Sequence, residues 1–232
     1  MSRPESIENR WDILYRDYPE VYEAFSNTPY HPTIYEQLPG IVDLRSKSIA
    51  DVGAGTGSSS LALARSARQV IGIEREPAML RQAQLKARSG NVIFVSGDAL
   101  ALPLVDDSVD VVTAMTLAVY PPERYRNFIN EGLRVARGPV VYVGIPPGWY
   151  GGDLNDVIEN PYKGKIDVEM DRIFIEECQF AHQDIFSDQE YGTVENIVSL
   201  YGFIFGRKAI EYLKRERKTA IRWKFRVYWK EQ

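Results

Sequence analysis

The chain has 232 residues and a formal net charge of −4, and 44% of its residues are hydrophobic while 26% are charged. This length suits one large α/β domain, and the composition is that of a folded globular protein. The acidic balance argues against a general nucleic-acid-binding protein, whose surface is normally basic.

The cysteine content and the absence of a recognisable targeting segment indicate in which cellular compartment the protein is expected. Cys178 is the only cysteine in the sequence, which excludes an intramolecular disulfide and a cysteine-rich zinc site. Residues 1–5 are polar, and no apolar stretch has the length of a signal peptide or of a membrane span. We therefore expect a soluble, cytoplasmic protein without a transmembrane segment; the sequence does not predict an oligomeric state.

Aromatic residues recur at helix-like spacing over residues 5–25, and Pro19 is expected to divide this stretch into two short helices. Residues 27–32 contain two prolines, which disfavour helix in the residues before them, so the sequence predicts a loop there. We expect residues 1–45 to form an N-terminal helical segment that precedes the main sheet.

From Ser48 onward, strand-like and helix-like segments alternate, as in a parallel sheet with crossover helices. Strands are predicted at 48–52, 69–74, 91–95, 109–113 and 139–143, and helices at 58–67, 77–88 and 122–135. The C-terminal third predicts a helix at 166–177, a strand at 179–186, mainly helix at 193–217, and a last strand at 221–229. This last strand is indicated by a clean alternation of apolar and polar side chains.

The segment Asp51-Val52-Gly53-Ala54-Gly55-Thr56-Gly57 joins the first predicted strand to the helix after it. Its glycines allow a tight turn and a close approach to a ligand, and open α/β sheets bind ligands at the carboxyl ends of their strands. Amides at the start of the following helix can meet a carboxylate or another polar group. The spacing is G-x-G-x-G with Ser58 next, whereas a dinucleotide fingerprint requires G-x-G-x-x-G. The turn therefore predicts a nucleotide-type crevice and disfavours an NAD-dependent oxidoreductase.

Acidic residues follow the next two predicted strands. Glu74 ends the second strand and can accept hydrogen bonds from both hydroxyls of a ribose, although a solvated glutamate at a strand end is the simpler alternative. Asp98, in Gly97-Asp98-Ala99, can accept from an adenine amino group while Ala99 packs against the ring; an aspartate that caps a turn is the alternative here. Both positions support a bound nucleoside.

Together these motifs resemble class I S-adenosylmethionine-dependent methyltransferases, in particular the branch that acts on small molecules and quinones. D-V-G-A-G-T-G is similar to the first motif of that family, and the acid of I-G-I-E is similar to its ribose-binding position. G-D-A-x-x-L-P followed by D-x-S-x-D-V-V is similar to its adenine-binding loop and fourth strand. The resemblance covers residues 48–145. It implies S-adenosylmethionine as the cofactor and places these residues at it: Asp51, Gly53, Ala54, Gly55, Gly57, Glu74, Arg75, Gly97, Asp98, Ala99 and Thr116.

The resemblance also implies a Rossmann-like, doubly wound sheet of seven strands, mostly parallel, with an antiparallel last strand. Residues 46–232 are expected to form the methyltransferase domain, with a helical insertion at 188–217 between strands six and seven. This insertion and residues 1–45 are expected to form a lid over the substrate site, because methyl transfer benefits from a closed and dry site. The candidate lid residues in the N-terminal segment are Tyr15, Tyr18 and Tyr22.

The nature of the methyl acceptor is constrained mainly by what the motifs lack. Amino-directed methyltransferases have an acid or asparagine directly before Pro-Pro, but residues 115–122 have a tyrosine there. Enzymes that methylate carbon 5 of pyrimidines carry a cysteine nucleophile after strand four, but Cys178 lies far from that strand in the sequence. Residues 144–148 offer no acid for a metal ion, so we expect none. We expect a small organic acceptor, methylated at oxygen, nitrogen or carbon. Methyl transfer depends mainly on holding the acceptor in line with the methyl–sulfur bond, and it requires no fixed catalytic side chain. If a general base takes part, His31 is a weak candidate, ahead of His182.

Residues 207–230 contain ten lysines and arginines and two acids, a local charge of +8. A solvated surface accounts for such a segment, and attraction to an acidic substrate, an anionic membrane or RNA is the alternative; charge patterning does not choose among these. Two other functions therefore stay open at this point: an RNA or protein methyltransferase that docks through this end, and a non-catalytic protein that binds S-adenosylmethionine.

Overall fold

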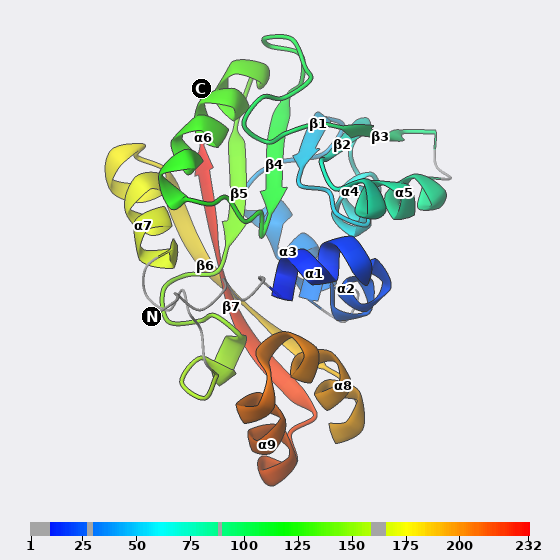
Figure 1. Ribbon diagram of the computed structural model, residues 1–232. Helices are drawn as coiled ribbons and strands as arrows, with labels where there is room; N and C mark the ends of the chain where they lie inside the picture. Colours follow the sequence, from blue (N-terminus) through cyan, green and yellow to red (C-terminus); the bar gives the residue numbers. More distant parts are fainter. Residues whose placement is uncertain (1–9, 27–29, 88–89, 159–165) are drawn as a thin grey trace, which may run out of the picture.

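A single mixed sheet of seven strands organises the protein (Figure 1). The computed structural model describes residues 10–26, 30–87, 90–158 and 166–232. The strands lie in the order β3-β2-β1-β4-β5-β7-β6. Their bounds are β1 (Ser48–Val52), β2 (Gln69–Glu74), β3 (Val92–Ser96), β4 (Val111–Met115), β5 (Val140–Gly144), β6 (Ala181–Glu190) and β7 (Ala220–Lys230). Strands β1 to β5 are parallel, and β7 is antiparallel to both of its neighbours, as the family resemblance implied.

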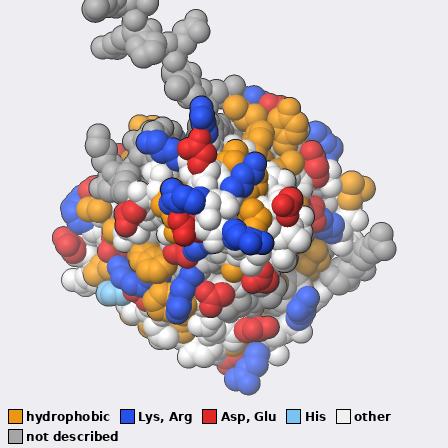
Figure 2. Space-filling view, turned by 90° about the horizontal axis from the view of Figure 1, so that it is seen from below, with side chains coloured by type: hydrophobic (Ala, Val, Ile, Leu, Met, Phe, Trp, Pro, Cys, Tyr) orange, Lys and Arg blue, Asp and Glu red, His pale blue; other side chains and the backbone are white. Residues whose placement is uncertain are grey.

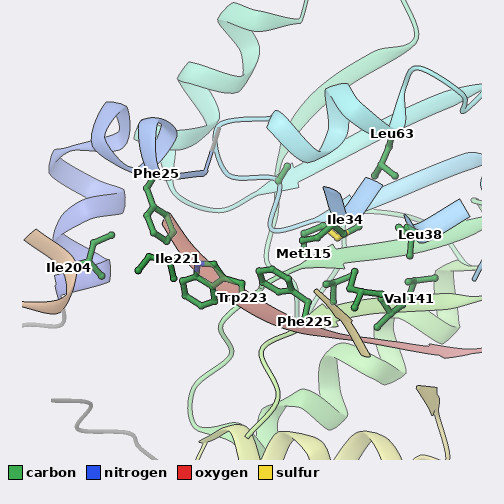
Figure 3. Packing of buried hydrophobic residues seen from close by; sticks show 14 of the residues in the cluster. Phe25, Ile34, Leu38, Leu63, Met115, Val141, Ile204, Ile221, Trp223 and Phe225 are labelled. Atoms are coloured by element: carbon green, nitrogen blue, oxygen red, sulfur yellow. The ribbon is translucent and has the colours of Figure 1, made fainter. Parts of the chain in front are cut away.

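Helices cover both faces of the sheet and form a separate core on each. One face carries α1 (Arg10–Asp17), α2 (Pro19–Ser26), α3 (Tyr30–Gln37), α4 (Ser58–Leu63), α5 (Pro77–Lys86), α8 (Val194–Phe205) and α9 (Arg207–Glu216). The other carries α6 (Tyr125–Val135) and α7 (Ile166–Arg172), which continues as a π turn over Ile173–Glu177. Figure 3 shows the first core, where Phe25 and Ile34 of the N-terminal helices lie near Trp223 and Phe225 of β7.

The burial of the strands explains their sequences. Strands β1, β4 and β5 are buried at every position, as expected for parallel strands with helices on both faces. In β7, Trp223 and Phe225 point into the first core, whereas Lys224 and Arg226 lie on the other face, opposite Phe186 and Asp184 of β6. The two different environments of its faces explain the alternation of apolar and polar residues from which this last strand was predicted.

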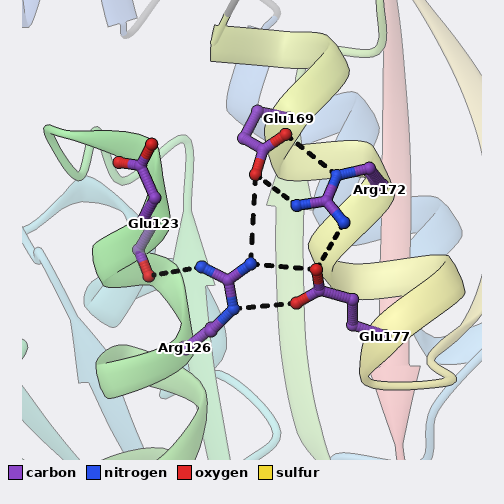
Figure 4. A network of polar contacts seen from close by, with 5 residues as sticks. All are labelled: Glu123, Arg126, Glu169, Arg172 and Glu177. Atoms are coloured by element: carbon purple, nitrogen blue, oxygen red, sulfur yellow. Dashed lines mark hydrogen bonds and ion pairs between the residues drawn. The ribbon is translucent and has the colours of Figure 1, made fainter.

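An ion-pair network joins the two helices of the second face (Figure 4). Arg126 of α6 binds Glu177 with an Nε–Oε2 distance of 2.8 Å and approaches Glu169 of α7 at 3.9 Å. Arg172 pairs with the same two glutamates. All four side chains are partly exposed, so the network contributes modestly to stability and mainly fixes the position of α7 against α6.

Most predicted strands and helices begin or end within a few residues of the observed ones, and two differences have a clear physical reason. The loop prediction for residues 27–32 was wrong from Tyr30 onward, because α3 begins there, and residues 27–29 lie outside the described residues. Pro32 is the third residue of α3, and the amides of a first helical turn have no intrahelical partner, so proline costs little at this position. Strand β6 continues to Glu190, since it pairs with β7 over its whole length. Gly206, with φ +78° and ψ −167°, then separates α8 from α9 in a conformation that only glycine adopts readily.

Candidate cofactor site

The turn after β1 has the tight geometry that its glycines suggested. Gly53, Gly55 and Gly57 all have positive φ, at +73°, +56° and +88°. A Cβ atom on Gly53 would lie 2.7 Å from Leu117 Cδ1, and one on Gly57 would lie 2.7 Å from Phe94 Cζ. The amides of Gly53 and Ala54 both donate to the carbonyl of Ile73, at 2.8 and 3.1 Å. The turn is thus held against β2, with no space for a side chain at Gly53 or Gly57.

Asp51 lies beneath this turn and stabilises it through buried hydrogen bonds. Its side chain is buried, and its carboxylate accepts hydrogen bonds from Ser59 Oγ and Ser60 Oγ at 2.6 Å and from Thr113 Oγ1 at 3.0 Å. Burial raises the pKa of Asp51, and the three hydroxyl donors oppose that shift. The residue therefore ties α4 and β4 to the turn, and its oxygens face these hydroxyls instead of a ligand.

Glu74 connects the turn to the end of β2. Its Oε2 accepts from the amide of Gly55 at 2.8 Å, and its Oε1 accepts from the amide of Glu76 at 2.8 Å. The side chain is only partly buried, so the carboxylate is held firmly while remaining accessible. Arg75, the next residue, is exposed.

The loop after β3 lies beside Glu74. The two strands pair so that Glu74 is opposite Ser96, and the amide of Gly97 donates to the carbonyl of Glu74 at 3.2 Å. Asp98 is exposed, and its Oδ1 accepts from the amide of Leu100 at 2.9 Å, which gives it the turn-capping contact of the simpler alternative. Ala99 is half-buried. The structure therefore brings the glycine turn, Glu74 and Gly97-Asp98-Ala99 together at one edge of the sheet.

The segment after β4 completes the floor of the site. The amide of Thr116 donates to the carbonyl of Val143 at 2.7 Å, and Thr116 has φ +51°. The carbonyl of Leu117 lies 2.9 Å from the hydroxyl of Tyr125 and 2.8 Å from that of Tyr142. Burial raises the pKa of both phenols, so both remain protonated and able to donate. These two tyrosines fix Leu117 against Gly53, a role that sequence reasoning missed because their meeting point depends on tertiary packing.

The N-terminal helix α2 covers the turn. A Cβ atom on Gly55 would lie 3.5 Å from the ring of Tyr22, and burial together with the charge of Glu74 raises the pKa of Tyr22. Lys86 of α5 holds α2 in place, because its Nζ pairs with Glu23 at 2.5 Å and donates to the carbonyl of Thr56 at 2.9 Å.

A small cavity lies between Tyr22 of α2 and the glycine turn. Its volume of about 10 Å³ has room for about one water molecule. It is lined by Tyr22, Gly53, Ala54, Thr56, Ser58, Ser59 and Met115. The hydroxyl of Thr56 is buried there without a hydrogen-bond partner in the described part of the chain.

Of the other predicted candidates, Tyr15 contacts the residue that covers the turn, whereas the histidines and Tyr18 are not placed at the turn. His31 lies in the first turn of α3, where side chains are outside the described residues. His182 is exposed near the start of β6, the far edge strand. Tyr15 lies edge-on to Tyr22, with ring centroids 5.1 Å apart, and Tyr18 is exposed and contacts Phe203 of α8.

Comparisons with known proteins agree with this geometry. Residues 49–138 match the family model described as a methyltransferase domain. The match covers well under half of the chain, and it agrees with the resemblance of the sequence motifs and the sheet order to class I S-adenosylmethionine-dependent methyltransferases.

Individual relatives cover only parts of their own length. A demethylmenaquinone methyltransferase of Renibacterium salmoninarum is 40% identical over 89 residues, which are 38% of this chain and 36% of the relative. A probable tocopherol O-methyltransferase of Oryza sativa is 34% identical over 107 residues, 44% of this chain and 29% of the relative. The chain thus spans well under two thirds of these proteins. The crystal structure of magnesium protoporphyrin IX methyltransferase from Synechocystis shares the fold, with a TM-score of 0.53 at 16% identity, covering 94% of this chain and 92% of that one.

Proposed function

We propose that this protein transfers a methyl group from S-adenosylmethionine to a small organic acceptor at oxygen, nitrogen or carbon. The observation that carries the proposal is the carboxylate of Glu74, which binds the glycine turn and lies beside the loop after β3. A nucleoside placed at this edge would meet an acid for its ribose and another for its base.

The residues present fit the cofactor. Glu74 would accept from the ribose hydroxyls, and Asp98 from the adenine amino group, beside Ala99. The turn at Gly53–Gly57 lies beneath Tyr22, and the unpaired hydroxyl of Thr56 would be available to a polar group of the cofactor there. When bound, the sulfonium supplies the electrophilic methyl group. Asp51 would act indirectly, because it holds the shape of the turn through three hydroxyl groups.

The protein's own contribution is alignment and exclusion of water. Tyr125 and Tyr142 hold the segment after β4 at the end of the sheet, where Met115 lines the cavity. The N-terminal segment, with Tyr22 over the turn, would close the site as a lid, and α8 of the insertion would support it through the contact between Tyr18 and Phe203. No residue is assigned as a general base, and His31 stays a weak candidate.

The lid interpretation predicts faster cofactor entry when Tyr22 is truncated. The cavity beneath Tyr22 is far smaller than a nucleoside, so α2 has to move before a cofactor enters. Tyr22→Ala is expected to raise the association rate of S-adenosylhomocysteine several-fold in stopped-flow fluorescence, because the ring no longer blocks Gly55. Tyr212→Ala, a truncation on α9, is the matched control. An unchanged association rate in Tyr22→Ala would show that α2 is not the gate.

The class of acceptor is tested with cofactor labelled on its methyl group. Demethylmenaquinone and tocopherol methyltransferases are named for lipophilic ring acceptors, and this supports a small organic acceptor here. Cell extract separated into small-molecule and macromolecular fractions is incubated with the protein and the labelled cofactor. Label is expected in the small-molecule fraction; label confined to RNA or protein would contradict the proposal and support a macromolecular substrate.

A further inference from the structure

The positive charge of the C-terminal region divides into two parts in the structure. On β7, acids of neighbouring elements pair with it: Arg226 pairs with Asp184 at 2.6 Å and with Asp171 of α7 at 2.9 Å, and Lys224 pairs with Asp184 at 2.6 Å. Residues 207–218, by contrast, contain six lysines and arginines and only two acids, and of these basic residues Lys218 pairs with Asp153. The other five basic residues of this segment lie on α9 and at Arg217 after it.

Helix α9 presents this charge on one face. Ala209 and Leu213 are buried against the core, while the basic residues that lie on the solvent side and in the turn are Arg207, Lys208, Lys214, Arg215 and Arg217. Side chains of Arg207 and Arg215 are 90% and 69% exposed, and their partners are glutamates of the same helix or turn. Exposed pairs of this kind are weak, and Lys214 and Arg217 have no ion pair within the described chain.

Exposed basic side chains and aromatic side chains occur together at this end of the molecule. Helices α8 and α9 lie together at the lower end of the molecule in Figure 1, and Figure 2, seen from that side, shows basic, acidic and apolar side chains interspersed there. Aromatic rings accompany the charge: Arg215 lies 5.4 Å from the ring centroid of Tyr212, and Phe203 at the end of α8 is exposed.

We propose that the exposed face of α9, with the turn at Arg217, docks onto the anionic surface of a phospholipid bilayer. Basic side chains attract anionic headgroups within a Debye length, and aromatic side chains next to them favour the interface between water and lipid. This inference goes beyond the proposed function, because it concerns where the protein binds and not which reaction it performs.

The proposal is tested by sedimentation with lipid vesicles. The full-length chain is expected to pellet with vesicles of phosphatidylcholine and phosphatidylglycerol in equal parts, to stay in solution with phosphatidylcholine alone, and to be released by salt. The double variant Lys214→Gln/Arg215→Gln, which removes two positive charges from α9, is expected to weaken vesicle binding about thirtyfold, because each basic side chain near an anionic surface contributes about 1 kcal/mol. The matched control, Arg65→Gln/Arg81→Gln, removes two exposed charges from the opposite end and is expected to bind as the wild type does.

Three results would overturn the proposal. They are pelleting that is equal with both vesicle types, binding that is equal in the α9 variant and the wild type, and no binding to vesicles at all. Fluorescence anisotropy with labelled single-stranded RNA is run in parallel, and an α9-dependent affinity for RNA without one for vesicles would assign the surface to nucleic acid. Melting curves of both variants confirm that each is folded, and because no step uses the cofactor, failure here leaves the methyltransferase proposal unaffected.

Discussion

Glu74→Ala is expected to bind S-adenosylhomocysteine about a hundredfold more weakly than the wild type in calorimetric titration. On the proposed function, the substitution would remove the acceptor for two ribose hydroxyls, and charge-assisted hydrogen bonds are worth roughly 1.5 kcal/mol or more each. It also releases the amides of Gly55 and Glu76, so the turn loses its link to β2. The loss should therefore exceed that from the contacts to ligand alone.

Two further variants separate these contributions. Glu195→Gln removes an exposed acid on α8 and is expected to leave the affinity unchanged. Glu74→Gln keeps one oxygen but sets an amide N–H₂ group against a backbone donor, so an intermediate affinity is expected. If Glu74→Ala bound the ligand as tightly as the wild type, Glu74 would not be a cofactor residue and the site would have to be placed elsewhere.

Asp51→Ala is expected to lower the free energy of unfolding by about 3 kcal/mol, because three hydroxyl groups lose a buried acceptor. Asp51→Asn keeps one acceptor oxygen and should cost roughly 1 kcal/mol. Urea denaturation of both variants measures the difference. Asp188→Ala, which removes an exposed carboxylate 3.8 Å from Arg222, is the control and should change stability by less than about 0.5 kcal/mol.

The pH dependence of the asparagine variant gives an independent check. Burial raises the folded-state pKa of Asp51, so its contribution to stability is full below the ordinary aspartate pKa and is lost as pH rises through the folded value. Asparagine does not titrate, so the stability gap between the wild type and Asp51→Asn should narrow as the pH rises from acid to neutral. A gap that widened over this range would mean that Asp51 is stabilised as the carboxylate, and the burial argument would fail.

The parts of the fold that sequence predicts well are those decided by local pattern. The first two strands, Ser48–Val52 and Gln69–Glu74, have the predicted bounds, because each is a short, mainly apolar segment that leads directly into a turn. The alternation in β7 likewise identified a strand with two different faces. The start of α3 was missed because proline in a first helical turn gives the same local signal as proline in a loop.

The candidate site shows the limit of such reasoning in another way. Spacing alone placed the glycine turn, Glu74 and Asp98 at one edge of the sheet, since the carboxyl ends of parallel neighbours must meet there. The spacing did not reveal that the carboxylate of Asp51 accepts hydrogen bonds from three hydroxyl groups of the protein itself. Nor did it reveal that Tyr125 and Tyr142 converge on Leu117, because these contacts join residues far apart in the sequence.

The most direct test of the methyltransferase assignment is calorimetric titration of the wild-type chain with S-adenosylhomocysteine and, separately, with NAD. The site at the glycine turn predicts saturable binding of S-adenosylhomocysteine at one site per chain and no binding of NAD. With the ligand at a hundred times its dissociation constant, the same binding should stabilise the fold by about 2.7 kcal/mol. Binding of NAD without binding of S-adenosylhomocysteine would contradict the assignment and point to a dinucleotide enzyme.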